Sequence, residues 1–163
     1  MNQATLQELK MKLASLMGLV ALAMAQLARA AEPSAVDRAA LLALADKMDR
    51  AWTAADVNEN SALFSADATA RFGNDPLGEG REAIQDQFRT FFADRPPNLR
   101  HVTRIDHIEL LSPDLAMWDA EVSVEQRQPS GAWLVQTRIQ NLTLATRQPQ
   151  GWKVRAVGAF PVR

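Results

Sequence analysis

The sequence predicts an α+β fold in which helices come first and an antiparallel sheet follows. Apolar residues recur at helical spacing as far as Phe92, and from Leu99 onward they alternate with polar residues. The turn-forming segment of residues 73–80 separates one predicted strand from the last helix. The chain has 163 residues, 47% of them hydrophobic and 23% charged, which is the composition of a single globular domain.

An apolar stripe predicts the first helix of this domain. Leu41, Met48 and Trp52 follow one another at intervals of seven and four residues, so they share one helical face. Asp56 then has the side chain of a cap for a short second helix, and Glu59 three residues later is the reciprocal partner in a capping box. We therefore interpret the Asp56 carboxylate as a cap rather than as a catalytic group.

A third helix is predicted to begin at about Gly80, after a short strand over residues 68–72 and a turn. Its inner face is formed by residues at i, i+4, i+7 and i+8, namely Ile84, Phe88, Phe91 and Phe92. The segment Arg95-Pro96-Pro97 ends the helix. At this spacing the aromatic residues are interpreted as core, part of which also lines a pocket.

The second half of the domain predicts an antiparallel sheet with one face packed on the helices. One strand buries Trp118, Ala120, Val122 and Val124. The next strand turns Val135, Thr137, Ile139 and Asn141 to one face, and the last strand turns Trp152, Val154, Ala156, Gly158 and Phe160. The opposite face is charged, and we expect Asp119, Glu121 and Glu125 to meet Arg138 and Gln136 across the hairpin.

Residues 1–30 have the pattern of a cleaved signal peptide. Lys10 and Lys12 precede an uncharged, mainly apolar run over residues 13–28, and Ala28-Arg29-Ala30 supplies a small-x-small cleavage site. The run is shorter than the ~20 residues that cross a bilayer core, so a retained anchor and a buried helix are the less favoured interpretations. Residues 31–163 then form an exported domain, periplasmic or secreted.

Charge and cysteine content exclude several classes of function. Residues 1–30 hold three of the 18 basic and one of the 19 acidic side chains, so the remaining domain has 15 basic and 18 acidic ones. A formal charge of about −3 gives no basic surface for nucleic acid. The absence of cysteine excludes disulfides, thiolate metal sites and thiol nucleophiles.

The order of these elements resembles the SnoaL-like branch of the nuclear transport factor 2-like superfamily over about residues 36–162. The residues that carry the resemblance are Trp52, Asp56, Leu63-Phe64, Asp67-Ala68, Gly80-Arg81-Glu82-Ala83-Ile84, Pro113-Asp114-Leu115-Ala116 and Gly151-Trp152-Lys153-Val154. The resemblance implies a cone-shaped domain, frequently dimeric, with three N-terminal helices packed on a curved antiparallel sheet around an apolar pocket. Members include isomerases, cyclases, dehydratases, epoxide hydrolases and association domains, so fold alone does not decide function.

One branch of that superfamily can be excluded. For a steroid isomerase of that superfamily, the resemblance implies an Asp base on the first strand and a Tyr in the first helix. This chain has no Tyr. Met48 lies about where the Tyr would be, and Phe72 about where the Asp would be.

Five residues remain as candidates to line the pocket: Trp52, Phe72, Phe88, Trp118 and Asn141. The partner of the Asn141 amide is either a backbone group or a polar atom of a ligand.

The predicted strand over residues 99–110 holds the candidate catalytic residues His101, Arg104 and Asp106. If the apolar residues that follow set the inner face, Arg104 and Asp106 point into the pocket and could position a polarised substrate or water. If a bulge shifts the register, His101 faces inward instead and becomes the natural general base. A surface position or a structural ion pair is the third possibility.

No metal site and no cofactor are expected. His101 and His107 are the only histidines, and their separation along a strand places them ~20 Å apart, too far to share one metal ion. Asp106 and His107 are neighbours whose side chains point to opposite faces of a strand. They therefore cannot pair with each other.

These observations predict an exported SnoaL-like protein whose apolar pocket binds a small, partly hydrophobic molecule. One alternative is a cofactor-independent acid–base enzyme of the same fold, such as an isomerase, dehydratase or hydrolase. Another is a dimeric association domain without catalysis. A homodimer is expected in each case. Nucleic acid is not an expected partner, nor is a membrane after cleavage.

We predict that the mature protein begins at Ala31, because the apolar run is too short to remain as an anchor and the cleavage pattern ends at Ala30. N-terminal sequencing of the exported protein measures this directly. Recovery of residues 13–28 in membrane-bound protein would contradict it.

Overall fold

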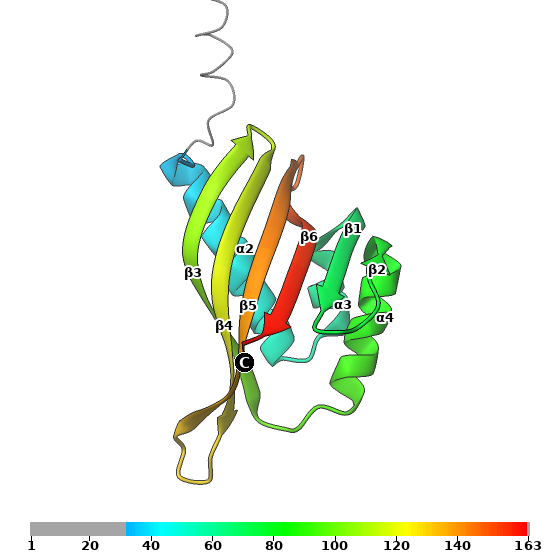
Figure 1. The fold of residues 1–163 in the computed structure, drawn as a ribbon, viewed down its shortest axis with the longest axis vertical. Helices are drawn as coiled ribbons and strands as arrows, with labels where there is room; N and C mark the ends of the chain where they lie inside the picture. Colours follow the sequence, from blue (N-terminus) through cyan, green and yellow to red (C-terminus); the bar gives the residue numbers. More distant parts are fainter. Residues whose placement is uncertain (1–31, 163) are drawn as a thin grey trace, which may run out of the picture. The chain divides into compact units, whose positions relative to one another are not determined.

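The computed structural model describes residues 32–162. The helices are α2 (Ala35–Thr53), α3 (Val57–Ala62) and α4 (Gly80–Ala93). The strands are β1 (Phe64–Phe72), β2 (Gly78–Glu79), β3 (Leu99–Ser112), β4 (Leu115–Arg127), β5 (Trp133–Gln148) and β6 (Gly151–Pro161) (Figure 1). The predicted α+β class, with helices before most of the sheet, is confirmed. The predicted signal peptide lies outside the described residues.

The six strands form one sheet in the order β2-β1-β6-β5-β4-β3. β3 to β6 pair antiparallel with their sequence neighbours, but β1 pairs parallel with β6. The sheet is therefore mixed, which corrects the expectation of a purely antiparallel one. The parallel pair arises because α4, β3, β4 and β5 intervene between the two strands, so β6 returns beside β1 in the same direction.

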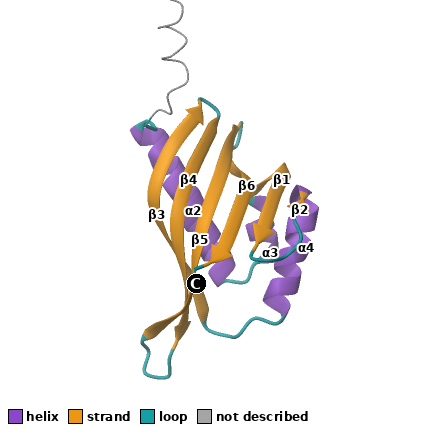
Figure 2. Cartoon of the chain, in the orientation of Figure 1, coloured by secondary structure: helices purple, strands orange, loops and turns teal. Residues whose placement is uncertain are grey.

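The helices cover the sheet from one side. Figure 2 shows α2 crossing behind the strands and α3 and α4 beside β1. α2 packs against β3 and β6, whereas α4 packs against β1 and α3. The buried face of α2 carries the predicted stripe, including Leu41, Leu44 and Trp52. In the described part of the chain, no helix is long and apolar enough to cross a membrane.

The predicted cap of the second helix is confirmed. The Asp56 carboxylate accepts a hydrogen bond of 2.8 Å from the backbone N–H of Glu59. The backbone N–H of Asp56 donates to the carbonyl of Ala51, 2.9 Å away, instead of to the Glu59 side chain. The cap bond therefore forms, and the reciprocal half of the capping box does not.

The third helix begins at Gly80 as predicted and ends at Ala93. Ile84 and Phe88 are buried on its inner face, and Phe92 packs partly buried against the core. The prediction that Phe91 is buried in the core is wrong, because 52% of this residue is exposed. Its ring still reaches Trp52, with centroids 5.8 Å apart.

Irregularities in three strands change which residues face the core. The β3–β4 register shifts between Ile105 and His107, the β4–β5 register after Val124, and the β5–β6 register after Leu144. Each shift reverses the side-chain alternation beyond it. Phe160 was predicted to share a face with the buried Trp152 and Val154, but 46% of it is exposed. Val135, predicted beside Asn141, is 38% exposed for the same reason.

The charged outer face of the sheet forms cross-strand contacts. Arg138 lies 2.6 Å from Glu121, which is the predicted ion pair. Asp119 accepts a hydrogen bond from Gln140, 2.6 Å away. Glu125 pairs with Arg100 on β3, at 2.6 Å, rather than with a residue of β5. The exposed Arg138–Glu121 pair adds little stability by itself.

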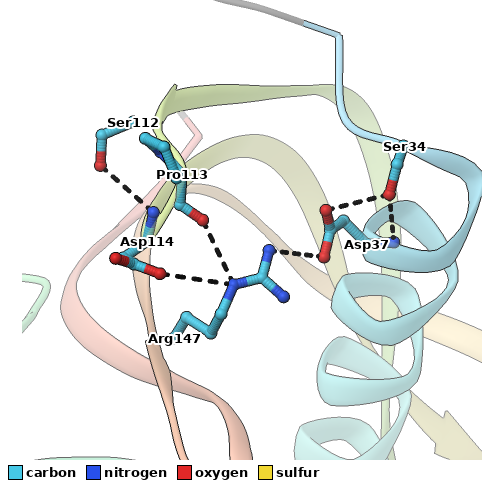
Figure 3. Close-up of polar contacts among 6 residues, drawn as sticks. All are labelled: Ser34, Asp37, Ser112, Pro113, Asp114 and Arg147. Carbon is cyan, nitrogen blue, oxygen red and sulfur yellow. Dashed lines mark hydrogen bonds and ion pairs between the residues drawn. The ribbon is translucent and has the colours of Figure 1, made fainter.

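A group of polar contacts around Arg147 of β5 holds the first turn of α2 to the sheet (Figure 3). The Arg147 guanidinium donates to the Asp37 carboxylate at 2.6 Å and to the carbonyl of Pro113 at 3.2 Å. Ser34 caps α2 by accepting from the N–H of Asp37, and its hydroxyl donates to the Asp37 carboxylate at 2.9 Å. The hydrogen bonds from Arg147 and Ser34 hold the pKa of Asp37 below its ordinary value.

This lowered pKa predicts a loss of stability in acid. The ionised Asp37 stabilises the folded state above the ordinary carboxyl pKa, and that contribution disappears as the pH falls through the lower folded pKa. The difference in unfolding free energy between the wild type and Asp37→Asn should therefore shrink on acidification. Urea melts across the acidic range measure it. Asp46→Asn, at the exposed Asp46–Arg50 pair, is the control and should change stability little at any pH.

Two substitutions separate core packing from capping. Trp52→Ala removes a large ring that is 8% exposed and should lower the unfolding free energy by about 3–5 kcal/mol. Asp56→Ala removes one cap bond and should lower it by about 1 kcal/mol. Equal losses in urea melts would contradict one of the two assignments.

Candidate active site

A cavity of about 350 Å³ lies between the helices and the sheet. Its lining is mostly apolar and comes from α2, α3, α4, β1 and strands β3 to β6. Four of the five predicted lining residues are there: Trp52, Phe72, Phe88 and Asn141. Trp118 is not among them. It is 1% exposed and lies four residues before the lining residue Val122 on β4, so it belongs to the core beside the cavity.

Trp52 is the centre of the aromatic wall. Its ring lies 6.0 Å from Phe92 in an edge-on arrangement and 4.9 Å from the imidazole of His101. The Arg95 guanidinium lies 4.4 Å from the ring centroid and donates to the carbonyls of Thr53 at 3.0 Å and Leu99 at 3.2 Å. Partial burial lowers the pKa of Arg95. Arg95 thus joins the last turn of α2 to the start of β3.

His101 reaches the cavity from β3 and pairs with Asp49 of α2. Nδ1 of His101 lies 2.6 Å from Oδ1 of Asp49. The same carboxylate accepts from the backbone N–H and the hydroxyl of Thr103, each at 2.7 Å. Both members of the pair are shielded, with side-chain exposures of 14% for His101 and 19% for Asp49. The helix and the strand therefore meet at one carboxylate.

This arrangement selects one protonation pattern of the histidine. An ionised carboxylate only accepts hydrogen bonds, so Nδ1 of His101 carries the proton that faces Asp49. In the neutral imidazole Nε2 then holds a lone pair and can take a proton. The ring of His101 lines the cavity. The pair has the components of a general base with an orienting carboxylate.

Asp49 is the functional candidate that sequence reasoning missed. It lies four residues after Ala45 and three before Trp52, so it belongs to the same helical face as these buried residues. A carboxylate on an apolar stripe must find a partner when the helix packs. A carboxylate on an apolar helical face was therefore a sign in the sequence that Asp49 has a specific partner. The sequence did not show that this partner lies on β3.

The register shift in β3 decides which candidates face inward. His101 and Thr103 point to the helices, as expected for a bulged strand. Arg104 and Asp106 pair with each other at 2.5 Å, with side-chain exposures of 67% and 38%. Neither lines the cavity, so the alternative that placed them in the pocket is wrong. The shift occurs at Asp106, after which Ile108 returns to the core.

Amide side chains supply most of the other polar groups. Asn141 of β5 is 9% exposed and accepts a hydrogen bond of 2.6 Å from the hydroxyl of Thr143. Asn60 of α3 and Gln87 of α4 also line the cavity. Within residues 32–162, the buried Nδ2 of Asn60 and Oε1 of Gln87 have no hydrogen-bond partner. A buried polar atom in this state costs roughly 1–3 kcal/mol.

In the described part of the chain, no three His, Asp or Glu side chains are grouped so that they could hold a metal ion. His107, the other histidine, is 54% exposed and lies 3.7 Å from Glu109. It is separate from the cavity lining.

Comparison with known proteins identifies the family. The SnoaL-like domain model matches residues 33–157, so the chain belongs to the SnoaL-like family. The resemblance to this branch of the nuclear transport factor 2-like superfamily is confirmed. No curated protein matches the chain with significant similarity.

Solved structures share the fold at low sequence identity. A domain of unknown function with a cystatin-like fold from Nostoc punctiforme is 18% identical, with 80% of each chain covered and a TM-score of 0.70. A nuclear transport factor 2-like protein from Novosphingobium aromaticivorans is 19% identical, covering 77% of this chain and 82% of that one, with a TM-score of 0.65. A ketosteroid isomerase-like protein from Erwinia carotovora atroseptica is 16% identical, covering 77% and 95%, with a TM-score of 0.63. At these identities the likeness establishes the fold alone.

Proposed function

We propose that this protein is a cofactor-independent acid–base enzyme that moves a proton on a small, partly hydrophobic molecule. The observation that carries the proposal is the Asp49–His101 pair, whose imidazole borders an apolar cavity of about 350 Å³. That volume is within the range of small-molecule sites, ~300–1,000 Å³. A simple binding pocket has no need for a histidine oriented by a carboxylate.

The proposed chemistry uses one group as base and then as acid. Nε2 of His101 takes a proton from a carbon of the substrate, and the electron pair of the broken C–H bond stays on the substrate. The imidazolium is stabilised by the Asp49 carboxylate, 2.6 Å from Nδ1. Return of the proton to another carbon completes an isomerisation. Its transfer to a departing hydroxyl, which leaves as water, completes a dehydration.

Neighbouring groups keep the base in place. The two hydrogen bonds from Thr103 hold the Asp49 carboxylate, so it cannot rotate away from the imidazole. The Trp52 ring, 4.9 Å from the imidazole, covers one face of it. A positioned general base accelerates proton transfer by roughly 10²–10⁴-fold. Apolar walls exclude competing water.

A binding protein without catalysis is the second candidate. The observation that favours it is the Asp49 carboxylate itself, because its three hydrogen bonds also join α2 to β3. On that interpretation His101 is a structural partner whose ring fills one wall. The two candidates differ in whether proton transfer occurs on a bound molecule.

We expect the protein to catalyse exchange of the C2 hydrogens of 1-tetralone in D₂O, because this bicyclic ketone combines an apolar skeleton with an acidified C–H bond. His101→Gln should remove the acceleration, and Asp49→Asn should lower it by roughly 10²-fold or more. Proton NMR measures the exchange, and titration calorimetry measures affinity, which should change only a few-fold in the variants.

His107→Gln is the matched control, since this exposed histidine is outside the cavity lining. It should leave the exchange rate unchanged. Bound 1-tetralone without exchange above the buffer rate would favour the binding protein. Equal losses in His101→Gln and His107→Gln would contradict the assigned site.

Export and homodimer formation are separate proposals. The first is supported by the apolar run over residues 13–28 and the cleavage pattern that follows it. The second is supported by exposed apolar side chains on the sheet, among them Leu142 and Phe160, which lie beside the charged cross-strand pairs. Neither is required for the proposed proton transfer.

A further inference from the structure

Cationic side chains from separate elements meet where α3 ends and β1 begins. Nζ of Lys153, on β6, donates to the carbonyl of Ala62 at 2.8 Å. Nε of Arg81, in the first turn of α4, donates to the carbonyl of Phe64 at 2.9 Å. The two carbonyls are only two residues apart in the chain. The ammonium and the guanidinium are therefore held close together, although like charges repel.

Lys47 of α2 adds a third positive charge to this place. Burial lowers the pKa of Lys153, and the neighbouring charges of Arg81 and Lys47 lower it further. Both cations thus lie near enough to the Lys153 ammonium to repel its proton. We call Lys47, Arg81 and Lys153 the cation cluster.

No carboxylate neutralises the cation cluster. Its three members take part in none of the ion pairs within residues 32–162. Asp46 pairs with Arg50 instead, and Asp67 of β1 lies 3.3 Å from Arg155. The domain over residues 31–163 has more acidic than basic side chains. A general excess of positive charge therefore does not explain why these cations are left without a counter-charge.

Capping of α3 accounts for only part of the arrangement. Carbonyls at a helix C-terminus carry partial negative charge and attract cations. Each carbonyl here takes one N–H, whereas Lys153 has three and Arg81 has five. The remaining N–H groups of these side chains form no hydrogen bond to the described residues. Lys153 and Arg81 are partly buried and Lys47 is exposed, so an anion from solvent can reach the spare donors.

We propose that the cation cluster binds a phosphate dianion, either inorganic phosphate or the phosphate group of a monoester. The guanidinium fork suits two oxygens of a phosphate, and the ammonium groups suit the others. A dianion offsets more of the three positive charges than a single carboxylate does.

The proposed phosphate site is separate from the cavity. No member of the cation cluster lines the cavity, although Phe64, whose carbonyl holds Arg81, contributes to its wall. The site therefore lies behind that wall and does not depend on the proposed proton transfer by His101. The inference goes beyond the proposed function and can fail independently of it.

A titration with inorganic phosphate tests the site, followed by ¹H–¹⁵N NMR at constant ionic strength and slightly alkaline pH. We expect saturable shifts of the backbone amides of residues 62–64 and 153–154 and of the Nε–H signal of Arg81. The dianions phosphate and methyl phosphate should bind at least about three-fold more tightly than the monoanion dimethyl phosphate. Binding of methyl phosphate assigns the site to monoesters as well, whereas binding of phosphate alone restricts it to the free ion.

Two substitutions test the cation cluster itself. Lys153→Met should weaken phosphate binding by at least about ten-fold, because a charged hydrogen bond is lost. This change also removes the bond to Ala62, so Lys47→Gln is the second variant. Lys47 is exposed and its side chain forms no hydrogen bond to the described residues. Its removal should leave the fold intact and weaken binding by about two- to five-fold.

Arg38→Gln is the matched control for Lys47→Gln. Arg38 is an exposed cation on the same helix, nine residues or ~13 Å earlier along the axis. It makes the same change in net charge and should leave phosphate affinity unchanged. His101→Gln should also leave it unchanged, since that residue serves the cavity.

The absence of saturable shifts in the wild type would overturn the proposal. Equal weakening by Lys47→Gln and Arg38→Gln would also overturn it, because the effect would then follow net charge and not a site. Dimethyl phosphate bound as tightly as methyl phosphate would contradict a site for a dianion. None of these outcomes affects the exchange of 1-tetralone, which tests the proton transfer separately.

Discussion

The Asp49 carboxylate is the contact on which the arrangement of this domain depends. It joins α2 to β3 by accepting three hydrogen bonds from His101 and Thr103. A shielded carboxylate is stable in a protein only when its oxygens are satisfied, so the helix and strand must meet in this register. The same contact orients the imidazole and closes one wall of the cavity. Stability and the proposed chemistry therefore share one interaction.

Two arginines hold the ends of the helix that carries this carboxylate. Arg147 binds Asp37 in the first turn of α2, and Arg95 binds the carbonyls of the last turn while covering Trp52. The helix is thus attached to the sheet at its beginning, middle and end. A general base works only when it is held close to one geometry. Arg147 is outside the cavity lining and binds the first turn of the same helix (Figure 3).

Irregular strands decide which of their side chains line the cavity. The register shift at Asp106 turns His101 inward while keeping Ile108 in the core. A second shift, in β6 at Arg155, brings Val157 and Ala159 to the cavity and leaves Phe160 outside. A regular alternation would have placed Arg104 and Asp106 against an apolar interior at a high desolvation cost. The bulges therefore separate charged side chains from the site.

The sequence by itself determined the local elements and the family. Helical stripes, the Asp56 cap, the turn before Gly80 and the strand with Val122 and Val124 were all readable, because they depend on spacing between near neighbours. His101 was named, but the direction of its side chain stayed open. Only the tertiary structure decided that direction and found Asp49 as its partner. The physical reason is that a β-bulge and a contact across 52 residues depend on packing between distant segments, which local periodicity does not encode.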